Sequence, residues 1–98
     1  EKYYHSVFYV VFTLLGLKIQ AEVKTNKGRI DAVAETTNTI FVFEFKLFDT
    51  AEKAIQQIKD TEYFQKHKGS KKEIKIIGAA FDAKERNIGE WLEEGIKN

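Results

Sequence analysis

The chain opens with two different spacings of apolar residues. From residue 4 to residue 15 they recur every three or four positions, which predicts an amphipathic helix, and Gly16 suits its end. From Lys18 to Lys24 apolar and polar residues alternate, which predicts a strand with one apolar face. The apolar face of this strand consists of Ile19, Ala21 and Val23.

Two further strands follow in close succession. The turn sequence Asn26-Lys27-Gly28 precedes a strand from Arg29 to Glu35, and Thr36-Thr37-Asn38 precedes one from Thr39 to Phe48. The last of these strands is apolar on both faces, which is typical of a central strand covered on both sides. One of its faces carries Phe41, Phe43, Phe45 and Leu47, and the other carries Ile40, Val42, Glu44, Lys46 and Phe48.

The second half of the chain predicts a helix and a strand, followed by an ambiguous tail. A helix is expected from Thr50 to His67, with Thr50 as its N-cap, and a strand from Glu73 to Phe81. A strand that arrives after a helix favours a crossover and parallel pairing with the third strand. Beyond Asp82 the apolar spacing fits a helix, and a short edge strand through Trp91 fits nearly as well.

The order of the predicted elements defines the fold class. A helix, a three-stranded meander, a second helix and a fourth strand make an α/β sandwich with a helix on each face of one mixed sheet. At 98 residues the chain has the size of a single domain, spanning 1–98, that buries roughly two-thirds of its unfolded surface. The sequence starts at Glu1 and contains no Met, so we expect it to be a piece of a longer protein.

Composition narrows the kinds of site that the domain can hold. The net charge is only +1, so nucleic-acid contact would depend on a local basic cluster rather than on total charge. There is no cysteine, which excludes disulfides and thiolate metal sites and fits a reducing compartment such as the cytoplasm. The two histidines disfavour a His-rich zinc site, so a bound metal should be a hard cation held by carboxylates. The apolar stretch from Val7 to Leu17 is too short to span a bilayer.

Three charged residues fall on adjacent predicted strands. Asp31 lies in the second strand, and Glu44 and Lys46 lie two positions apart in the third, so these two share a face. Charged groups that converge on an apolar sheet are costly to bury unless a metal or a phosphate lies among them. The alternative is a cross-strand salt bridge on a half-exposed sheet, which would contribute only about 0–1 kcal/mol.

Several short motifs accompany these residues along the chain. They are Tyr3-Tyr4-His5, Gly28-Arg29-Ile30-Asp31, Glu44-Phe45-Lys46 with Leu47, Gln57-Ile58 followed by Tyr63, Ile77-Gly78, Phe81-Asp82, and Arg86-Asn87-Ile88 leading to Trp91. In this order they resemble the PD-(D/E)XK nuclease superfamily, whose restriction-endonuclease-like core is α-β-β-β-α-β. More narrowly, they are similar to the nuclease-like domain in the C-terminal part of bacterial AAA-ATPase-like proteins.

The resemblance implies roles for the charged residues. Asp31 and Glu44 would bind a divalent cation, Mg²⁺ or Mn²⁺, with the backbone carbonyl of Phe45 as a further ligand. Lys46 would act on the attacking water, either as a base or as an electrostatic anchor. Glu1 matches the acidic catalytic residue that many members place on the first helix; without the resemblance it is a favourable charge at a helix N-terminus.

Four other residues are auxiliary candidates. Gln57 and Tyr63 resemble a fourth motif of one branch of the superfamily, although the helical period sets them roughly 120° apart. For His5 a hydrogen-bonded position near the core is favoured over a catalytic role, and for Arg29 a phosphate contact and a surface ion pair are equally favoured. The basic cluster after the second helix supplies candidate nucleic-acid contacts, with solvated surface as the alternative. Its candidates are Lys68, Lys71 and Lys72.

The resemblance and the charged residues together predict a metal-dependent nuclease that hydrolyses phosphodiester bonds in nucleic acid. The alternative is a catalytically inactive module of the same fold that binds nucleic acid or protein within a larger AAA-ATPase-like protein. The expected partners are nucleic acid, with DNA favoured over RNA, an N-terminal ATPase-like domain of the same chain, and a second subunit forming a homodimer. No membrane partner is expected.

Overall fold

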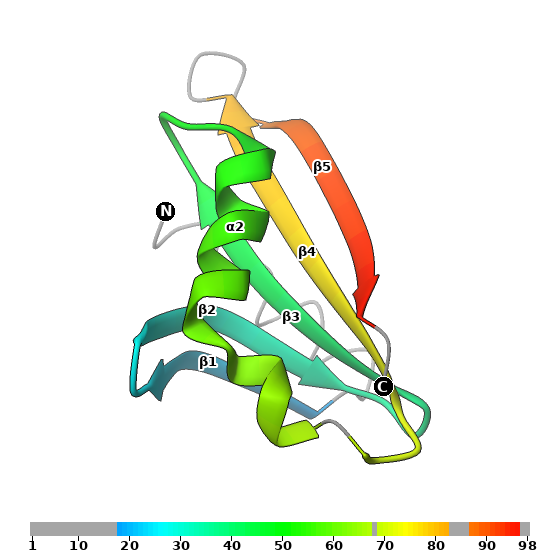
Figure 1. Cartoon of the computed structure of the whole chain (residues 1–98). Helices are drawn as coiled ribbons and strands as arrows, with labels where there is room; N and C mark the ends of the chain where they lie inside the picture. The colour runs from blue at the N-terminus through cyan, green and yellow to red at the C-terminus, as the bar shows by residue number, and fades with distance from the viewer. Residues whose placement is uncertain (1–17, 68, 83–86, 97–98) are drawn as a thin grey trace.

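One five-stranded sheet carries the described part of the structure, and a helix lies across one of its faces (Figure 1). The computed structural model describes residues 18–67, 69–82 and 87–96. The strands are β1 (Lys18–Thr25), β2 (Gly28–Glu35), β3 (Thr39–Lys46), β4 (Glu73–Asp82) and β5 (Asn87–Ile96), and they lie side by side in that order. The predicted α/β class with a mixed sheet is confirmed. The helix expected between residues 4 and 15 lies outside the described residues.

The pairing of the strands follows the predicted topology. All neighbouring pairs are antiparallel except β3 and β4, which are parallel. A parallel pair needs a crossover connection, and α2 (Ala51–Thr61) supplies it. The tail, for which helix and strand were both open, forms strand β5 at one edge of the sheet. Strand β3 ends at Lys46 and not at Phe48 as predicted, and the Phe48 side chain is 89% exposed.

Helix α2 begins where the sequence predicts and ends earlier. The Thr50 hydroxyl accepts a hydrogen bond from the N–H of Lys53 at 3.1 Å, which is the N-cap arrangement. At the other end Glu62 adopts the left-handed conformation (φ 55°), and its N–H donates to the carbonyl of Lys59. A short 3₁₀ helix, η1 (Tyr63–His67), follows. The prediction of one continuous helix over this whole stretch is therefore wrong.

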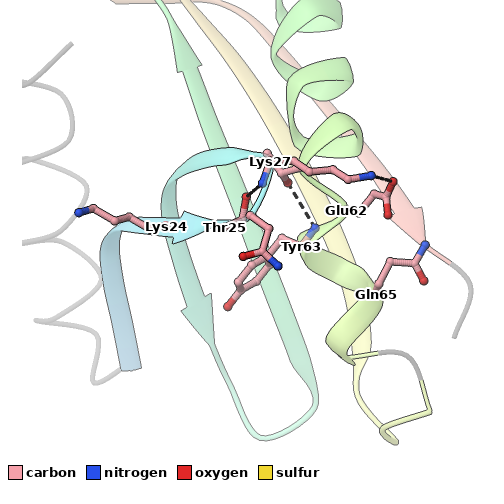
Figure 2. Close-up of a pocket in the computed structure, with 8 residues that line it drawn as sticks. Lys24, Thr25, Lys27, Glu62, Tyr63 and Gln65 are labelled. Atoms are coloured by element: carbon pink, nitrogen blue, oxygen red, sulfur yellow. Dashed lines mark hydrogen bonds and ion pairs between the residues drawn. The ribbon is translucent and has the colours of Figure 1, made fainter.

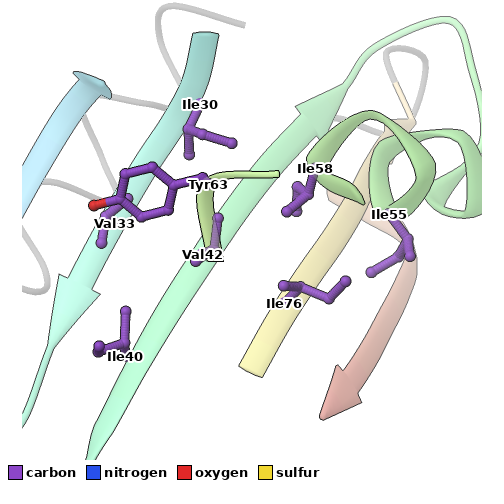
Figure 3. Packing of buried hydrophobic residues seen from close by; sticks show 8 residues of the cluster. All are labelled: Ile30, Val33, Ile40, Val42, Ile55, Ile58, Tyr63 and Ile76. Atoms are coloured by element: carbon purple, nitrogen blue, oxygen red, sulfur yellow. The ribbon is translucent and has the colours of Figure 1, made fainter. Parts of the chain in front are cut away.

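Apolar side chains cover both faces of the sheet. On the face under α2 the cluster consists of Ile30, Val33, Ile40, Val42, Ile55, Ile58, Tyr63 and Ile76 (Figure 3). On the opposite face it consists of Ala32, Ala34, Phe43, Phe45, Ile77, Ala79 and Phe81. Strand β3 contributes alternate residues to both clusters, so it is the doubly covered central strand that its two apolar rows predict.

Strand β1 departs from the predicted alternation. Ile19 packs against the cluster on the face opposite α2, whereas Val23 packs against the cluster under α2. Between them Glu22 adopts a left-handed conformation (φ 54°), which breaks the two-residue period of the strand. The prediction that Ile19, Ala21 and Val23 share one apolar face is therefore wrong, and Ala21 is exposed.

Gly78 sets how closely α2 approaches the sheet. In the parallel register of β3 and β4 it lies opposite Glu44. A Cβ atom added to Gly78 would lie 2.5 Å from the carbonyl oxygen of Ala51 and 3.0 Å from the Cβ of Ala54. The first turn of α2 therefore rests on the backbone of β4, an approach that requires glycine.

We expect Gly78→Ala to lower the free energy of unfolding by about 1–3 kcal/mol, because the added methyl group must push α2 away from β4. Gly95→Ala in β5 is the matched control, since among the described residues no atom outside its two chain neighbours lies within 4 Å of a Cβ at that position. Urea denaturation followed by circular dichroism measures both variants. Wild-type stability in Gly78→Ala would show that the contact between α2 and β4 is looser than described.

Candidate metal-binding and catalytic site

Strands β2 and β3 separate at the position of two carboxylates. Their backbone ladder ends with the pair Ala32 and Phe43, and the next residues on the two strands are Asp31 and Glu44. Figure 1 shows β2 and β3 diverging from the turn that joins them, with α2 lying over the sheet beside the opening. The candidate site is built at this point of separation.

Each carboxylate accepts a hydrogen bond from a backbone N–H of the other strand. The N–H of Phe45 donates to Asp31 Oδ2 at 2.8 Å, and the N–H of Asp31 donates to Glu44 Oε1 at 3.2 Å. Asp31 is 8% exposed and Glu44 is 4% exposed. These bonds stand in for the backbone pairs that the diverging strands lose, so the two carboxylates are held rigidly on the sheet.

A glutamine of α2 joins the predicted lysine to the same carboxylate. Gln57 Nε2 donates to Glu44 Oε2 at 2.5 Å, and Lys46 Nζ donates to Gln57 Oε1. The Lys46 ammonium thus reaches Glu44 through an amide, which differs from a simple cross-strand salt bridge. Side chains from β2, β3 and α2 meet at one point.

Burial is the main electrostatic influence on Glu44. It raises the pKa of Glu44 from 4.5 to about 8, and the negative charge of Asp31 adds to the rise. The N–H of Asp31 and the positive charge of Lys46 oppose the shift. Without a cation, burial and the Asp31 charge therefore favour the protonated form of the Glu44 carboxyl. A positive charge placed between the two carboxylates would reverse this preference.

The donor chemistry of the site fits a hard divalent cation. Mg²⁺ is commonly held by one or two carboxylates and keeps several of its waters, and Asp31 and Glu44 supply such a pair. Within residues 18–67, 69–82 and 87–96, no group of three or more His, Cys, Asp or Glu side chains could hold a metal. The carbonyl of Phe45 remains the additional ligand implied by the resemblance, and Glu1 lies outside the described residues.

Tyr63 does not join this group. It is 7% exposed in the cluster under α2, its ring centroid lies 5.3 Å from that of His67, and burial raises its pKa. Because α2 ends before Tyr63, the helical angle used to relate it to Gln57 does not apply. Arg29 is exposed on β2, two residues before Asp31.

The predicted basic cluster lies at the other end of β3. Lys72 Nζ forms an ion pair with Glu35 Oε2 at 2.8 Å, and this contact lowers the pKa of Glu35. Because β4 starts opposite the first residue of β3, the loop before β4 is remote from Lys46 at the end of β3. Lys71 is exposed in this loop, whereas Lys68 and His5 lie outside the described residues.

The sequence predicts Gln57 as an auxiliary site residue and does not specify which residue its side chain contacts. The structure makes it the link between Lys46 and Glu44. The available signal was the position of Gln57 on the helix that follows the charged strand. That signal does not specify the direction in which α2 crosses the sheet, and this direction decides which helix residue reaches the carboxylates.

A family model and a relative both match the chain. The model of the PD-(D/E)XK nuclease superfamily matches residues 1–91, and the chain belongs to this superfamily. A protein of Azotobacter chroococcum mcd 1, described as "Uncharacterized protein in vnfD 5'region", is 35% identical over 98 residues. The match covers 98% of the chain and 19% of the relative, so the chain spans about a fifth of that protein's length. No solved structure matches the chain. In the described part of the chain, no helix is long and apolar enough to cross a membrane.

The stability of the metal-free protein should fall as the pH rises from about 5 to about 8. Between 4.5, the ordinary pKa of a glutamate, and about 8, its value in the fold, folded Glu44 binds a proton that the unfolded chain has lost. Thermal unfolding in a chelator at several pH values measures the slope. Glu44→Gln should flatten it, whereas Glu52→Gln, an exposed change on α2, should leave it unchanged. An equal slope in Glu44→Gln and wild type would assign the pH dependence to another group.

Proposed function

We propose that this protein hydrolyses phosphodiester bonds in nucleic acid, with Mg²⁺ or Mn²⁺ held by Asp31 and Glu44. The observation that carries the proposal is the pair of buried carboxylates at the separation of β2 and β3, with Lys46 tied to them through Gln57. Burial, and after it the negative charge of Asp31, raises the pKa of Glu44, so the ionised pair is costly without a cation. A divalent cation at this position supplies neutralisation of the negative charge that develops on the phosphate.

The residues of the chain divide the remaining work. Asp31 and Glu44 would hold the cation, since backbone N–H groups already fix both carboxylates at the separation of β2 and β3. Lys46 carries the positive charge that orients the attacking water and offsets charge on the phosphate. Gln57 is a positioning residue, since its amide keeps the flexible lysine side chain beside Glu44.

A second candidate function uses the same fold for binding and not for phosphodiester hydrolysis. It is a catalytically inactive module that binds nucleic acid or protein inside a larger AAA-ATPase-like protein. The presence of Asp31, Glu44 and Lys46 in one connected site favours the nuclease. The proposal further includes DNA as the substrate, an ATPase-like domain and a second copy as partners, and a cytoplasmic location.

Lys46→Ala should lower the rate of cleavage by about 10²-fold or more, the scale expected for the loss of one positioned catalytic group. Binding of Mg²⁺ should persist, because both carboxylates remain. Lys46→Arg should not restore the rate, since the planar guanidinium does not replace a compact ammonium. Cleavage assays with single-stranded, duplex and branched DNA and RNA in Mg²⁺ and in Mn²⁺ measure this. Full activity in Lys46→Ala would place the site elsewhere, and an inactive wild type under all conditions would favour the binding module.

Gln57→Ala should lower kcat by about tenfold and leave KM nearly unchanged, because it frees the lysine without removing a group that binds substrate. The neighbouring Gln56→Ala is the matched control, since Gln56 is exposed and its amide bonds Asp60 on the same helix. Steady-state kinetics of the two variants give the comparison. A rise in KM with kcat unchanged in Gln57→Ala would instead make Gln57 a substrate contact.

A further inference from the structure

A polar hollow lies between the β1–β2 turn and the end of α2. Its volume is about 380 Å³, and its lining residues are Lys24, Thr25, Asn26, Lys27, Thr61, Glu62, Tyr63 and Gln65. Figure 2 shows the turn on one side, η1 on the other, and Lys27 reaching across to Glu62. This volume falls in the range of roughly 300–1,000 Å³ that small-molecule sites occupy.

The hollow adjoins the candidate catalytic site through two elements. Thr61 lies four residues after Gln57 on α2, so the two side chains are neighbours on one helix face, about 5–6 Å apart at Cβ. On the sheet, Gly28 lies three residues before Asp31, and a Cβ on Gly28 would lie 3.7 Å from Thr61 Cγ2. The hollow is therefore roughly 10 Å along β2 from the carboxylates.

The side chains around the hollow suit a nucleotide. The side-chain amides of Asn26 and Gln65 offer both donors and acceptors, which match the edges of a base and a sugar. Around its turn the β1–β2 hairpin is basic, because residues 24–29 carry three basic side chains and no acidic one, which suits a phosphate backbone. These basic residues are Lys24, Lys27 and Arg29, and all are exposed.

The ion pair across the mouth of the hollow does not block a ligand. Lys27 Nζ lies 2.6 Å from Glu62 Oε1, and the side chains are 57% and 50% exposed. Exposed pairs of this kind contribute little stability, so a phosphate competes readily for the lysine. The ion pair between Lys72 and Glu35 joins the loop before β4 to the end of β2. It lies at the far end of β3 from the carboxylates, so its lysine is not available to the hollow.

We propose that this hollow binds one nucleotide of a single-stranded nucleic acid, one or two positions along the strand from the phosphate that is cut. The proposal rests on the proposed nuclease function and adds the class of substrate to it. A duplex is too wide for a hollow of this volume, whereas an extended single strand can place one base in it and continue past Gln57 to the carboxylates. The basic hairpin then contacts the backbone of that strand.

The test measures binding of a labelled single-stranded oligonucleotide and of a matched duplex by fluorescence anisotropy in a chelator, where cleavage is prevented. Gln65→Ala removes an amide from the lining of the hollow without changing charge, and it should weaken single-strand binding by roughly fivefold, the scale of one lost hydrogen bond. Lys24→Gln should reduce the slope of log K against log salt by about 1. Lys75→Gln is the matched charge control, because Lys75 lies on β4 paired with Glu93 of β5.

The outcomes separate this proposal from the nuclease proposal. Weakened single-strand binding in Gln65→Ala, with duplex binding, divalent-metal binding and the unfolding midpoint unchanged, supports the hollow as the nucleotide site. Wild-type binding in Gln65→Ala and Lys24→Gln, while Asp31→Asn still abolishes cleavage, overturns the hollow and leaves the nuclease intact. A wild-type protein that neither binds nor cuts any nucleic acid overturns both proposals.

Discussion

The separation of β2 from β3 is possible because two carboxylates take over the hydrogen bonds that the strands lose. The buried N–H of Phe45 has the carboxylate of Asp31 as its acceptor, and the N–H of Asp31 has that of Glu44. A buried donor left without an acceptor costs about 1–3 kcal/mol, so these side chains are required by the sheet itself. The same two groups are the candidate metal ligands. The carboxylates that complete the hydrogen bonding of the sheet are therefore also the groups expected to bind the metal.

Helix α2 is fixed at both ends, and this fixes Gln57 between them. At its start the helix rests on Gly78, and the N–H of Ala51 donates to Glu90 Oε1 of β5 at 3.0 Å. At its end Thr61 lies against the β1–β2 turn near Gly28. A side chain in the middle of a helix held in this way has little freedom to shift. The position of the Gln57 amide, which orients Lys46, thus depends on contacts made by the first and last turns of α2.

Periodicity was sufficient for the parts of the fold in which each residue follows its local pattern. The two apolar rows of β3 predicted a doubly covered central strand, and the order of elements predicted the parallel pairing with β4. Periodicity failed where single residues without a glycine signal adopt positive φ. Glu22 reverses the faces of β1, and Glu62 ends α2 early.

The candidate site was predictable in part for a related reason. Asp31, Glu44 and Lys46 could be expected on adjacent strands from their spacing alone, and the structure brings the two carboxylates together. The link between Lys46 and Glu44 through Gln57 could not be predicted, because it depends on how α2 is placed against the sheet. The tail was ambiguous because its apolar residues have helical spacing, while pairing with β4 makes it a strand.

The left-handed residue in β1 also bears on the behaviour of the sheet toward other chains. Strand β1 lies at one edge of the sheet that residues 18–96 form in the described part of the chain. An unbroken, flat edge offers free backbone groups as a template for another strand. Glu22 interrupts this edge with a change of face and places a charge on it. Natural sheets use irregularities and edge charges of this kind to resist edge-to-edge aggregation. A residue that spoils the regularity of the strand thereby helps to keep neighbouring molecules apart.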